Sequence, residues 1–238
     1  MAEEPSAKRH HGEKREYTKT LKGVELHGKE TLEIVSTSVP DKANKVMSRF
    51  RMNGGGLYPS FIGVDVEYTN KEEPPQMAAV LQLCVEELCL VYHIAAATKW
   101  PKRLKDFLQE EKLHTFVGFN IGGDKRMLDK SGLEINPNNF IDMQRKWKDP
   151  KTDKYYDSLA DVAGGVIDPF YNDMNKKMDR ADHKLWGTSP LPDNLITYAG
   201  IDAYATYKSW KTIDNMVTGW DISKEQEADP YYHCNFAG

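Results

Sequence analysis

Cysteine is scarce in this sequence, and the net charge is small. Three cysteines occur among 238 residues, at Cys84, Cys89 and Cys234. Their odd number and their spacing match neither a disulfide framework nor a zinc site, so we expect free thiols in the cytosol or nucleus and not in a secreted protein. The formal net charge of −4 argues against a protein that holds long duplexes by neutralising phosphates, but it allows an enzyme that binds a few nucleotides at a strand end.

Long apolar runs are absent as well. No run approaches the roughly 20 residues of a membrane helix, and the first residues, MAEEPSAKRHHGEKREYTK, are polar where a signal peptide is apolar. There is also no internal repeat and no low-complexity segment. With 39% hydrophobic and 29% charged residues, the composition is that of a soluble globular protein without a membrane partner.

Hydrophobic periodicity covers most of the chain but not its ends. Residues 1–28 mix charges of both signs without an apolar pattern, which favours a flexible tail. The pattern fades again after Thr218. We therefore expect one folded domain at residues 29–218 and a C-terminal tail at residues 219–238.

Strand and helix patterns alternate within the expected domain. Apolar alternation and short apolar runs predict strands at 31–39, 61–69, 114–120 and 139–143 and a hairpin over 78–95. Helical spacing predicts helices at 39–52, 100–112, 158–167 and 191–216, and a short helix that ends at Gly132. This order predicts an α/β domain with a central mixed sheet of five to six strands flanked by helices.

The strand FIGVDVEYT, at residues 61–69, carries two acids. Asp65 and Glu67 are two residues apart, so in a strand they point to one face while the apolar residues between them point to the other. Neighbouring carboxylates repel, and burying them is costly unless a cation offsets their charge. Hard oxygen ligands suit magnesium or manganese. The alternative is that the strand ends here and both acids are solvated.

Two further candidates lie later in the chain. Asp124 follows an apolar strand and two glycines in FVGFNIGGDKRML, where α/β folds place ligands, although an ordinary helix N-cap is the other interpretation. Tyr198 and Asp202, in ITYAGIDAYATY, are four residues apart and share one face of a helix. A packed tyrosine and a solvated aspartate are the alternative there.

Taken together, the four carboxylates indicate a site for two divalent cations. Such ions lie about 3.5–4 Å apart in enzymes that displace a group in line at a phosphodiester. A phenol close to the ions can orient the attacking water or help to deprotonate it.

The three motifs resemble those of the DEDD superfamily of 3′–5′ exonucleases. FIGVDVEYT, FVGFNIGGDKRML and ITYAGIDAYATYKSW match its first, second and third motifs in order, over residues 30 to 218. Thr197 stands where the histidine branch has its base, so the chain is similar to the tyrosine branch (DEDDy), which includes RNase D and the Werner-type exonuclease domain.

The resemblance implies an RNase H-like (DnaQ-like exonuclease) fold and two Mg²⁺ or Mn²⁺ ions. By this likeness Asp65, Glu67 and Asp202 coordinate the catalytic ion, and Asp65 with Asp124 coordinates the second. Tyr198 positions the water that attacks the terminal phosphodiester, and 5′-mononucleotides are released.

The sequence departs from the family at two places. Ser189 stands before Pro-Leu where the family often has a basic residue, so the phosphate contact of that residue does not carry over to this sequence by the resemblance. The stretch at 145–157 is long and basic, and it carries aromatic residues that can stack on a single strand. The candidate substrate contacts there are Lys146, Trp147, Lys148 and Tyr155. A solvated loop with a few packing aromatics is the alternative.

We therefore expect a metal-dependent 3′–5′ exonuclease that acts on single-stranded nucleic acid, with RNA favoured over DNA. We expect no second domain that handles duplexes. Any substrate contact outside the active site is therefore expected to come from the surface of this domain or from self-association. A non-catalytic binding or adaptor protein on the same fold, and a hydrolase of small nucleotides, are the alternatives.

Overall fold

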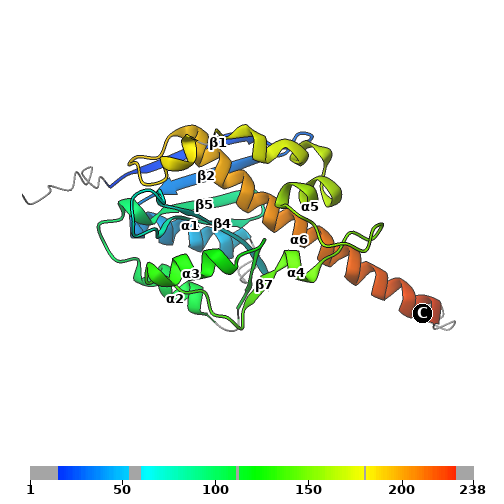
Figure 1. Ribbon diagram of the computed structural model, residues 1–238. Coiled ribbons are helices and arrows are strands. Elements are labelled where there is room, and N and C mark those ends of the chain that lie inside the picture. The colour runs from blue at the N-terminus through cyan, green and yellow to red at the C-terminus, as the bar shows by residue number, and fades with distance from the viewer. Residues whose placement is uncertain (1–15, 54–59, 111–112, 180, 229–238) are drawn as a thin grey trace, which may run out of the picture.

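Seven strands form one mixed sheet in the computed structural model, which describes residues 16–53, 60–110, 113–179 and 181–228 (Figure 1). The order across the sheet is β1-β2-β5-β4-β3-β6-β7. The parallel pairs are β2–β5, β3–β6 and β6–β7, and the other neighbours are antiparallel. The strands are β1 Thr18–Glu25, β2 Thr31–Thr37, β3 Phe61–Tyr68, β4 Ala78–Val85, β5 Leu88–His93, β6 Thr115–Gly118 and β7 Phe140–Asp142.

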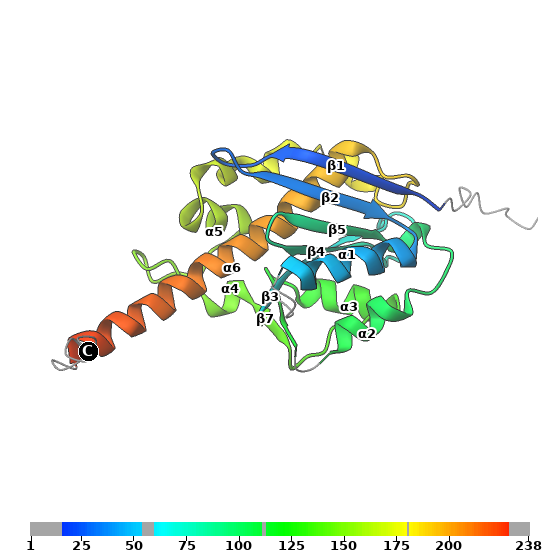
Figure 2. The ribbon, with the colours of Figure 1, turned by 180° about the vertical axis from the view of Figure 1, so that it is seen from behind.

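Helices cover both faces of this sheet. They are α1 Pro40–Asn53, α2 Lys102–Gln109, α3 Gly122–Lys130, α4 Met143–Lys146, α5 Leu159–Val166 and α6 Asp193–Ala228, with 3₁₀ turns η1 Ile94–Ala96, η2 Pro169–Lys177 and η3 Asp182–Lys184. Figures 1 and 2 show α6 crossing one face of the sheet and α1 lying over the other. In the part of the chain described, no helix is both long and apolar enough to cross a membrane.

The alternation of β3 separates two apolar cores. Val64 and Val66 belong to a core shared with α1, α2 and α3. On the opposite face, the core under α6 includes Val80, Val91 and Ala203. Side chains of a strand point alternately to its two faces. Asp65 and Glu67 therefore face α6, while Val64 and Val66 face the other core.

The sheet is wider than the sequence predicted, and β1 explains the difference. Residues 18–25 fall in the segment expected to be a flexible tail, but they form an edge strand that pairs antiparallel with β2. The strand was missed because its side chains are mostly exposed, so TKTLKGVE has little apolar alternation. Backbone hydrogen bonds to β2 hold β1 in the sheet. Such bonds do not require a particular pattern of side chains.

The last helix is also longer than predicted. The boundary was placed at Thr218, but α6 continues to Ala228. The final residues include Lys, Glu, Gln and Ala, which have high helix propensity without adding an apolar stripe. An apolar pattern therefore marks where a helix is buried, and it does not mark where the helix ends. The rest of the predicted tails, at 1–15 and 229–238, lies outside the described residues.

Candidate metal centre

Close packing of α6 against β3 brings the first and third motifs together. A Cβ added to Gly63 would lie 2.5 Å from the carbonyl oxygen of Ala203 and 2.8 Å from the Cβ of Tyr207. Glycine at this position therefore lets the backbone of α6 approach the strand. Asp202, next to Ala203, is carried to the face of β3 that bears Asp65.

Three of the four predicted acids form a tight group. Ligand oxygens of Asp65, Glu67 and Asp202 all lie within 4.8 Å of one another. Asp202 is buried and the other two side chains are partly buried. The three carboxylates therefore lie close together, as expected. The alternative, in which the acids of the strand and of the helix point into solvent, is wrong.

The electrostatics of this group call for a cation. Burial raises the pKa of Asp202 to about 7, although a hydrogen bond with Tyr198 acts in the other direction. The pKa values of Asp65 and Glu67 are raised well above their usual range by burial first and then by the charges of Asp202 and Asp124. Several ionised acids at this spacing repel one another, so full ionisation at neutral pH needs a compensating positive charge.

The donor set fits a hard divalent cation. Within the described residues, Oδ1 of Asp202 is buried and has no hydrogen-bond partner. A buried carboxylate oxygen without a partner is costly, and an ion at this point would supply the missing contact. All three side chains offer carboxylate oxygens, which Mg²⁺ and Mn²⁺ prefer.

Asp124 lies beside this group and is held by a tyrosine. It occupies the first turn of α3, but the N-cap of that helix is Ile121 and no side chain caps it, so the N-cap interpretation is wrong. Asp124 is 8% exposed and accepts a hydrogen bond from the hydroxyl of Tyr68. Burial raises the pKa of Asp124 to about 6, with a smaller increase from Asp142 and an opposing effect of the Tyr68 hydrogen bond.

Tyr198 stands one helical turn before Asp202. Its ring centroid lies 6.0 Å from that of His183 and 6.4 Å from that of Trp186, which fixes the ring between α6 and the segment before it. Burial and the charges of Asp202 and Glu67 raise the pKa of Tyr198 far above its usual value. The hydroxyl therefore stays protonated at neutral pH, beside the acids.

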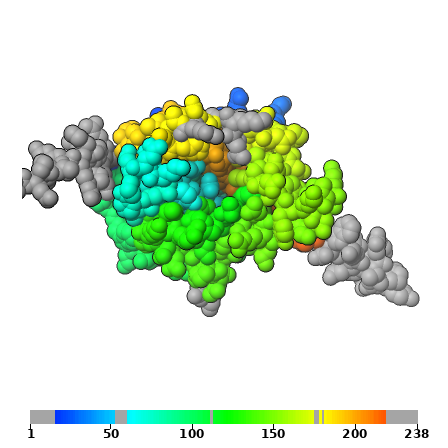
Figure 3. Space-filling model, viewed as in Figure 1, coloured from blue at the N-terminus to red at the C-terminus, as the bar shows by residue number. Residues whose placement is uncertain are grey.

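Two cavities flank the acids. One, of about 490 Å³, is lined by Glu67, Tyr68, His183, Lys184 and Trp186 among others. The other, of about 190 Å³, is lined by Met174, Tyr198 and Asp202 among others. Figure 3 shows the surface hollowed between the cyan segment after β3 and the yellow segment before α6, with orange α6 at the floor.

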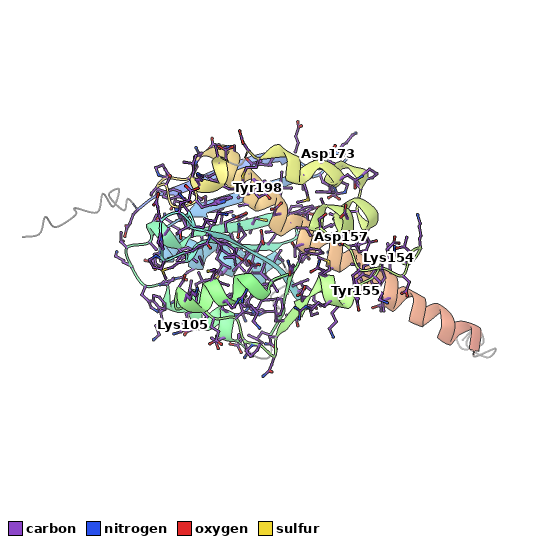
Figure 4. The ribbon with its side chains drawn as sticks, in the orientation of Figure 1. Lys105, Lys154, Tyr155, Asp157, Asp173 and Tyr198 are labelled. Carbon is purple, nitrogen blue, oxygen red and sulfur yellow. The ribbon has the colours of Figure 1, made fainter. Side chains whose placement is uncertain are left out.

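The predicted substrate contacts at 145–157 do not share one environment. Trp147 is partly buried and packs on a core that includes Val117 and Met143, so it is not free to stack on a base. Tyr155 is 53% exposed, and Nζ of Lys148 lies 5.3 Å from its ring centroid. Lys146 is exposed. Figure 4 shows Tyr155 well separated from Tyr198, so this loop is not part of the acid group.

Two residues of the site were missed by the sequence analysis. Tyr68 touches Asp124, and Lys184 lines the larger cavity, where Nζ lies 2.9 Å from a carboxylate oxygen of Glu72. Lys184 comes from η3, a short turn without an apolar pattern. Tyr68 lies in the first motif, but alternation along the strand points it away from the acids, and Lys184 has no spacing that relates it to a motif, so the sequence did not indicate these contacts.

Comparison with known proteins agrees with the geometry. The family model described as 3′–5′ exonuclease matches residues 42–218. The Mus musculus bifunctional 3′–5′ exonuclease/ATP-dependent helicase WRN is 25% identical over 162 residues, which is 65% of this chain and 11% of that protein. This chain spans less than half the length of the curated relatives that it matches.

Solved structures share the fold. The EXO domain of Aedes aegypti Nibbler matches with a TM-score of 0.59 at 16% identity, over 75% of this chain and 86% of that one. Escherichia coli RNase D, described as an exoribonuclease involved in structured RNA processing, matches with a TM-score of 0.53 at 18% identity, over 78% of this chain and 46% of that one. The predicted RNase H-like exonuclease fold is confirmed.

Proposed function

Because this chain belongs to the 3′–5′ exonuclease family, we propose that it is a metal-dependent nuclease that removes nucleotides one at a time from the 3′ end of single-stranded nucleic acid. The observation that carries the proposal is the buried group of Asp65, Glu67 and Asp202. Burial and mutual repulsion raise the pKa values of these acids, and their oxygens suit a divalent cation.

Each acid has a place in the proposed site. Asp65, Glu67 and Asp202 would hold one Mg²⁺ or Mn²⁺ ion, and Asp65 with Asp124 would hold a second. Bound ions supply positive charge that stabilises the attacking and leaving oxygens of an in-line displacement. The contribution of the chain is to fix the acids on β3 and on the two helices that contact it, α3 and α6.

Tyr198 is proposed to orient the attacking water. A phenol with a pKa far above neutrality donates a hydrogen bond and does not remove a proton. Burial and neighbouring acids give Tyr198 such a pKa. Of the two roles open to this residue, positioning the water is therefore favoured over deprotonating it.

The substrate is proposed to be single-stranded RNA in preference to DNA. The cavity of about 490 Å³ beside Glu67 is within the size range of small-molecule sites, so it suits a terminal nucleotide. Lys146, Lys148 and exposed Tyr155 would contact the strand further from its end. Among the neighbours, RNase D is described as an exoribonuclease, which favours RNA, whereas WRN joins an exonuclease to a helicase. We place the activity in the cytosol or nucleus.

The test is nucleotide release with a matched inactive variant. Wild type and Asp65→Asn are incubated with a 5′-labelled 20-mer of single-stranded RNA and Mn²⁺ or Mg²⁺. We expect a ladder that shortens from the 3′ end and 5′-mononucleotide products from the wild type, and no products from the variant or in EDTA. Equal degradation by both proteins would show that the activity is a contaminant.

The same assay separates the alternatives. Single-stranded DNA, a duplex with a 3′ overhang and a dinucleotide are added to the panel at equal concentration. Fastest turnover on the RNA 20-mer supports the proposal. Fastest turnover on the dinucleotide supports a small-nucleotide hydrolase, and tight binding of the 20-mer without products supports a non-catalytic binding protein.

A further inference from the structure

A second phenol lies among the acids and has no part in the proposed reaction. Tyr68 directly follows Glu67 at the end of β3. The pairing with β4 shifts by one residue between these two positions, since Glu67 is opposite Val80 and Tyr68 is opposite Ala78. The extra residue, Ala79, lies on β4. Tyr68 itself keeps the alternation of β3 and packs against the core that contains Val64 and Val66, on the face that α3 covers. The hydroxyl of Tyr68 reaches Asp124 and donates a hydrogen bond to its Oδ1.

The surroundings of this hydroxyl are those of the metal site. The hydroxyl contacts Asp124, and its residue directly follows Glu67 in β3. A phenol is protonated at neutral pH and a carboxylate only accepts, so Tyr68 is the donor. A Cβ at position 123 would lie 3.1 Å from the hydroxyl oxygen. The second glycine of the GGD sequence therefore leaves the space in which the phenol meets Asp124.

This contact uses one half of the Asp124 carboxylate. Among the described residues, Tyr68 is the one side chain that hydrogen-bonds to Asp124. The other oxygen, Oδ2, is left without a side-chain donor and is available to an ion. A carboxylate fixed through one oxygen has less freedom to lose when the other binds a metal, and such supporting contacts typically change metal affinity by about 10–100-fold.

We propose that Tyr68 is a positioning residue for the second metal ion: its hydroxyl holds Asp124 through Oδ1 and presents Oδ2 to the ion shared with Asp65. This inference rests on the proposed function, because it assumes that two ions bind. It assigns Tyr68 no contact with the reacting atoms. Tyr68 acts through Asp124, and the ion held by Asp65, Glu67 and Asp202 does not depend on it.

The experiment measures Mn²⁺ binding without substrate. Wild type and Tyr68→Phe are titrated with Mn²⁺ by calorimetry. Electron paramagnetic resonance follows the signal of two spin-coupled Mn²⁺ ions. We expect the wild type to bind two ions. In Tyr68→Phe the second should bind about 10–100-fold more weakly and the first unchanged, and excess Mn²⁺ should restore turnover.

Two comparisons make the result specific. Tyr92→Phe removes a hydroxyl from the core on the other face, where Tyr92 has no hydrogen-bond partner within the described chain, and it should bind both ions as the wild type does. In an Asp124→Asn background, adding Tyr68→Phe should cause no further loss, because the residue through which Tyr68 acts is already altered.

The outcomes distinguish the proposed role of Tyr68 from the proposed exonuclease activity. If Tyr68→Phe forms the coupled pair at the same Mn²⁺ concentration as the wild type, Tyr68 does not position Asp124, and the exonuclease proposal is untouched. A loss of substrate affinity that excess Mn²⁺ does not reverse would make Tyr68 a substrate contact and overturn the inference. Wild type that binds no Mn²⁺ would overturn both.

Discussion

The two faces of β3 serve opposite purposes within eight residues. On one face, Ile62, Val64 and Val66 are buried in an apolar core beneath α1, α2 and α3. On the other, Asp65 and Glu67 lie beside Asp202 of α6, and burial and the neighbouring acids raise the pKa values of both. The strand is held by its apolar face, and this allows the opposite face to carry acids that weaken the metal-free fold.

Three buried polar groups on the α6 face lack hydrogen-bond partners within the described residues. Gln82 lies opposite Asp65 on β4, and within the described residues neither its amide nitrogen nor its amide oxygen has a hydrogen-bond partner. The same is true of Asp202 Oδ1 and the hydroxyl of Ser209, both on α6. Unsatisfied polar groups are unfavourable, so these groups add to the cost of the acids on this face. The hydroxyl of Tyr92 is unsatisfied on the opposite face, but in the part of the chain described no acid group lies beside it there.

The largest expected effect comes from moving an acid to the wrong face. Val64→Asp places a carboxylate in the apolar core, where no cation is available, and should lower the free energy of unfolding by more than about 4 kcal/mol. That is a large part of the total stability of a domain. Urea unfolding followed by circular dichroism measures it. The neighbouring change, Asp65→Asn, should leave the EDTA-treated protein as stable as the wild type or more so. If both variants lose a comparable free energy of unfolding, the two faces of β3 do not differ in their tolerance of charge.

Tyr198→Phe tests the functional face without altering its charge. Removing the hydroxyl should lower kcat by roughly 100-fold or more, the usual contribution of a group that positions or transfers a proton. Because Tyr198 is not a proposed metal ligand, the Mn²⁺ affinity should be that of the wild type. Single-turnover kinetics at saturating Mn²⁺ gives the first quantity and calorimetry the second. Unchanged turnover would remove Tyr198 from the mechanism.

The pH dependence of stability should show the cost of the acidic face. The pKa of Asp202 is about 7 in the folded chain and about 3.9 in an unfolded one. A raised folded pKa means that the folded state binds the extra proton, so this contribution is complete below about pH 4 and is lost as the pH rises through about 7. In EDTA, the stability of the wild type relative to Asp202→Asn should fall by roughly 2–4 kcal/mol between pH 4 and pH 8.

The comparison with Asp202→Asn is needed because two histidines act in the opposite direction. Burial lowers the pKa values of His93 and His114 to about 4, so their contribution to stability is lost as the pH falls from about 6.5. That contribution is common to both proteins and cancels in the difference. A difference that stays constant with pH would show that Asp202 titrates normally, and saturating Mn²⁺ should reverse the sign of the difference at pH 8.

The sequence predicted the acids better than the residues around them. Asp65, Glu67 and Asp202 stood out because a charge in an apolar strand or helix is unusual, and their spacing placed them on defined faces. Tyr68 was invisible to the same reasoning. Strict alternation places it on the face opposite Glu67, where it packs with Val64 and Val66, and its contact with Asp124 arises because α3 covers that face.

The sequence analysis also failed to predict β1 and the environment of the loop at 145–157, because neither leaves a clear apolar pattern. β1 has few buried side chains and is held by backbone pairing with β2, so its sequence resembles a solvated tail. At 145–157 the composition predicted a basic aromatic loop, but it did not distinguish a ring packed in the core from a ring in solvent. Trp147 and Tyr155 differ in this way because only the first lies against Met143 and Val117.

The smallest expected effect belongs to Tyr155, which lies on neither face of β3. Stacking on a base contributes about 1–3 kcal/mol, and the lower value is expected because Lys148 already covers the ring. Tyr155→Ala should raise KM for an RNA 20-mer about fivefold with kcat unchanged. Tyr155→Phe keeps the ring and should match the wild type. The KM for a dinucleotide should not change in either variant, because Tyr155 lies apart from Tyr198 (Figure 4). An equal effect on both substrates would mean that Tyr155 supports the folding of the site and does not hold the strand.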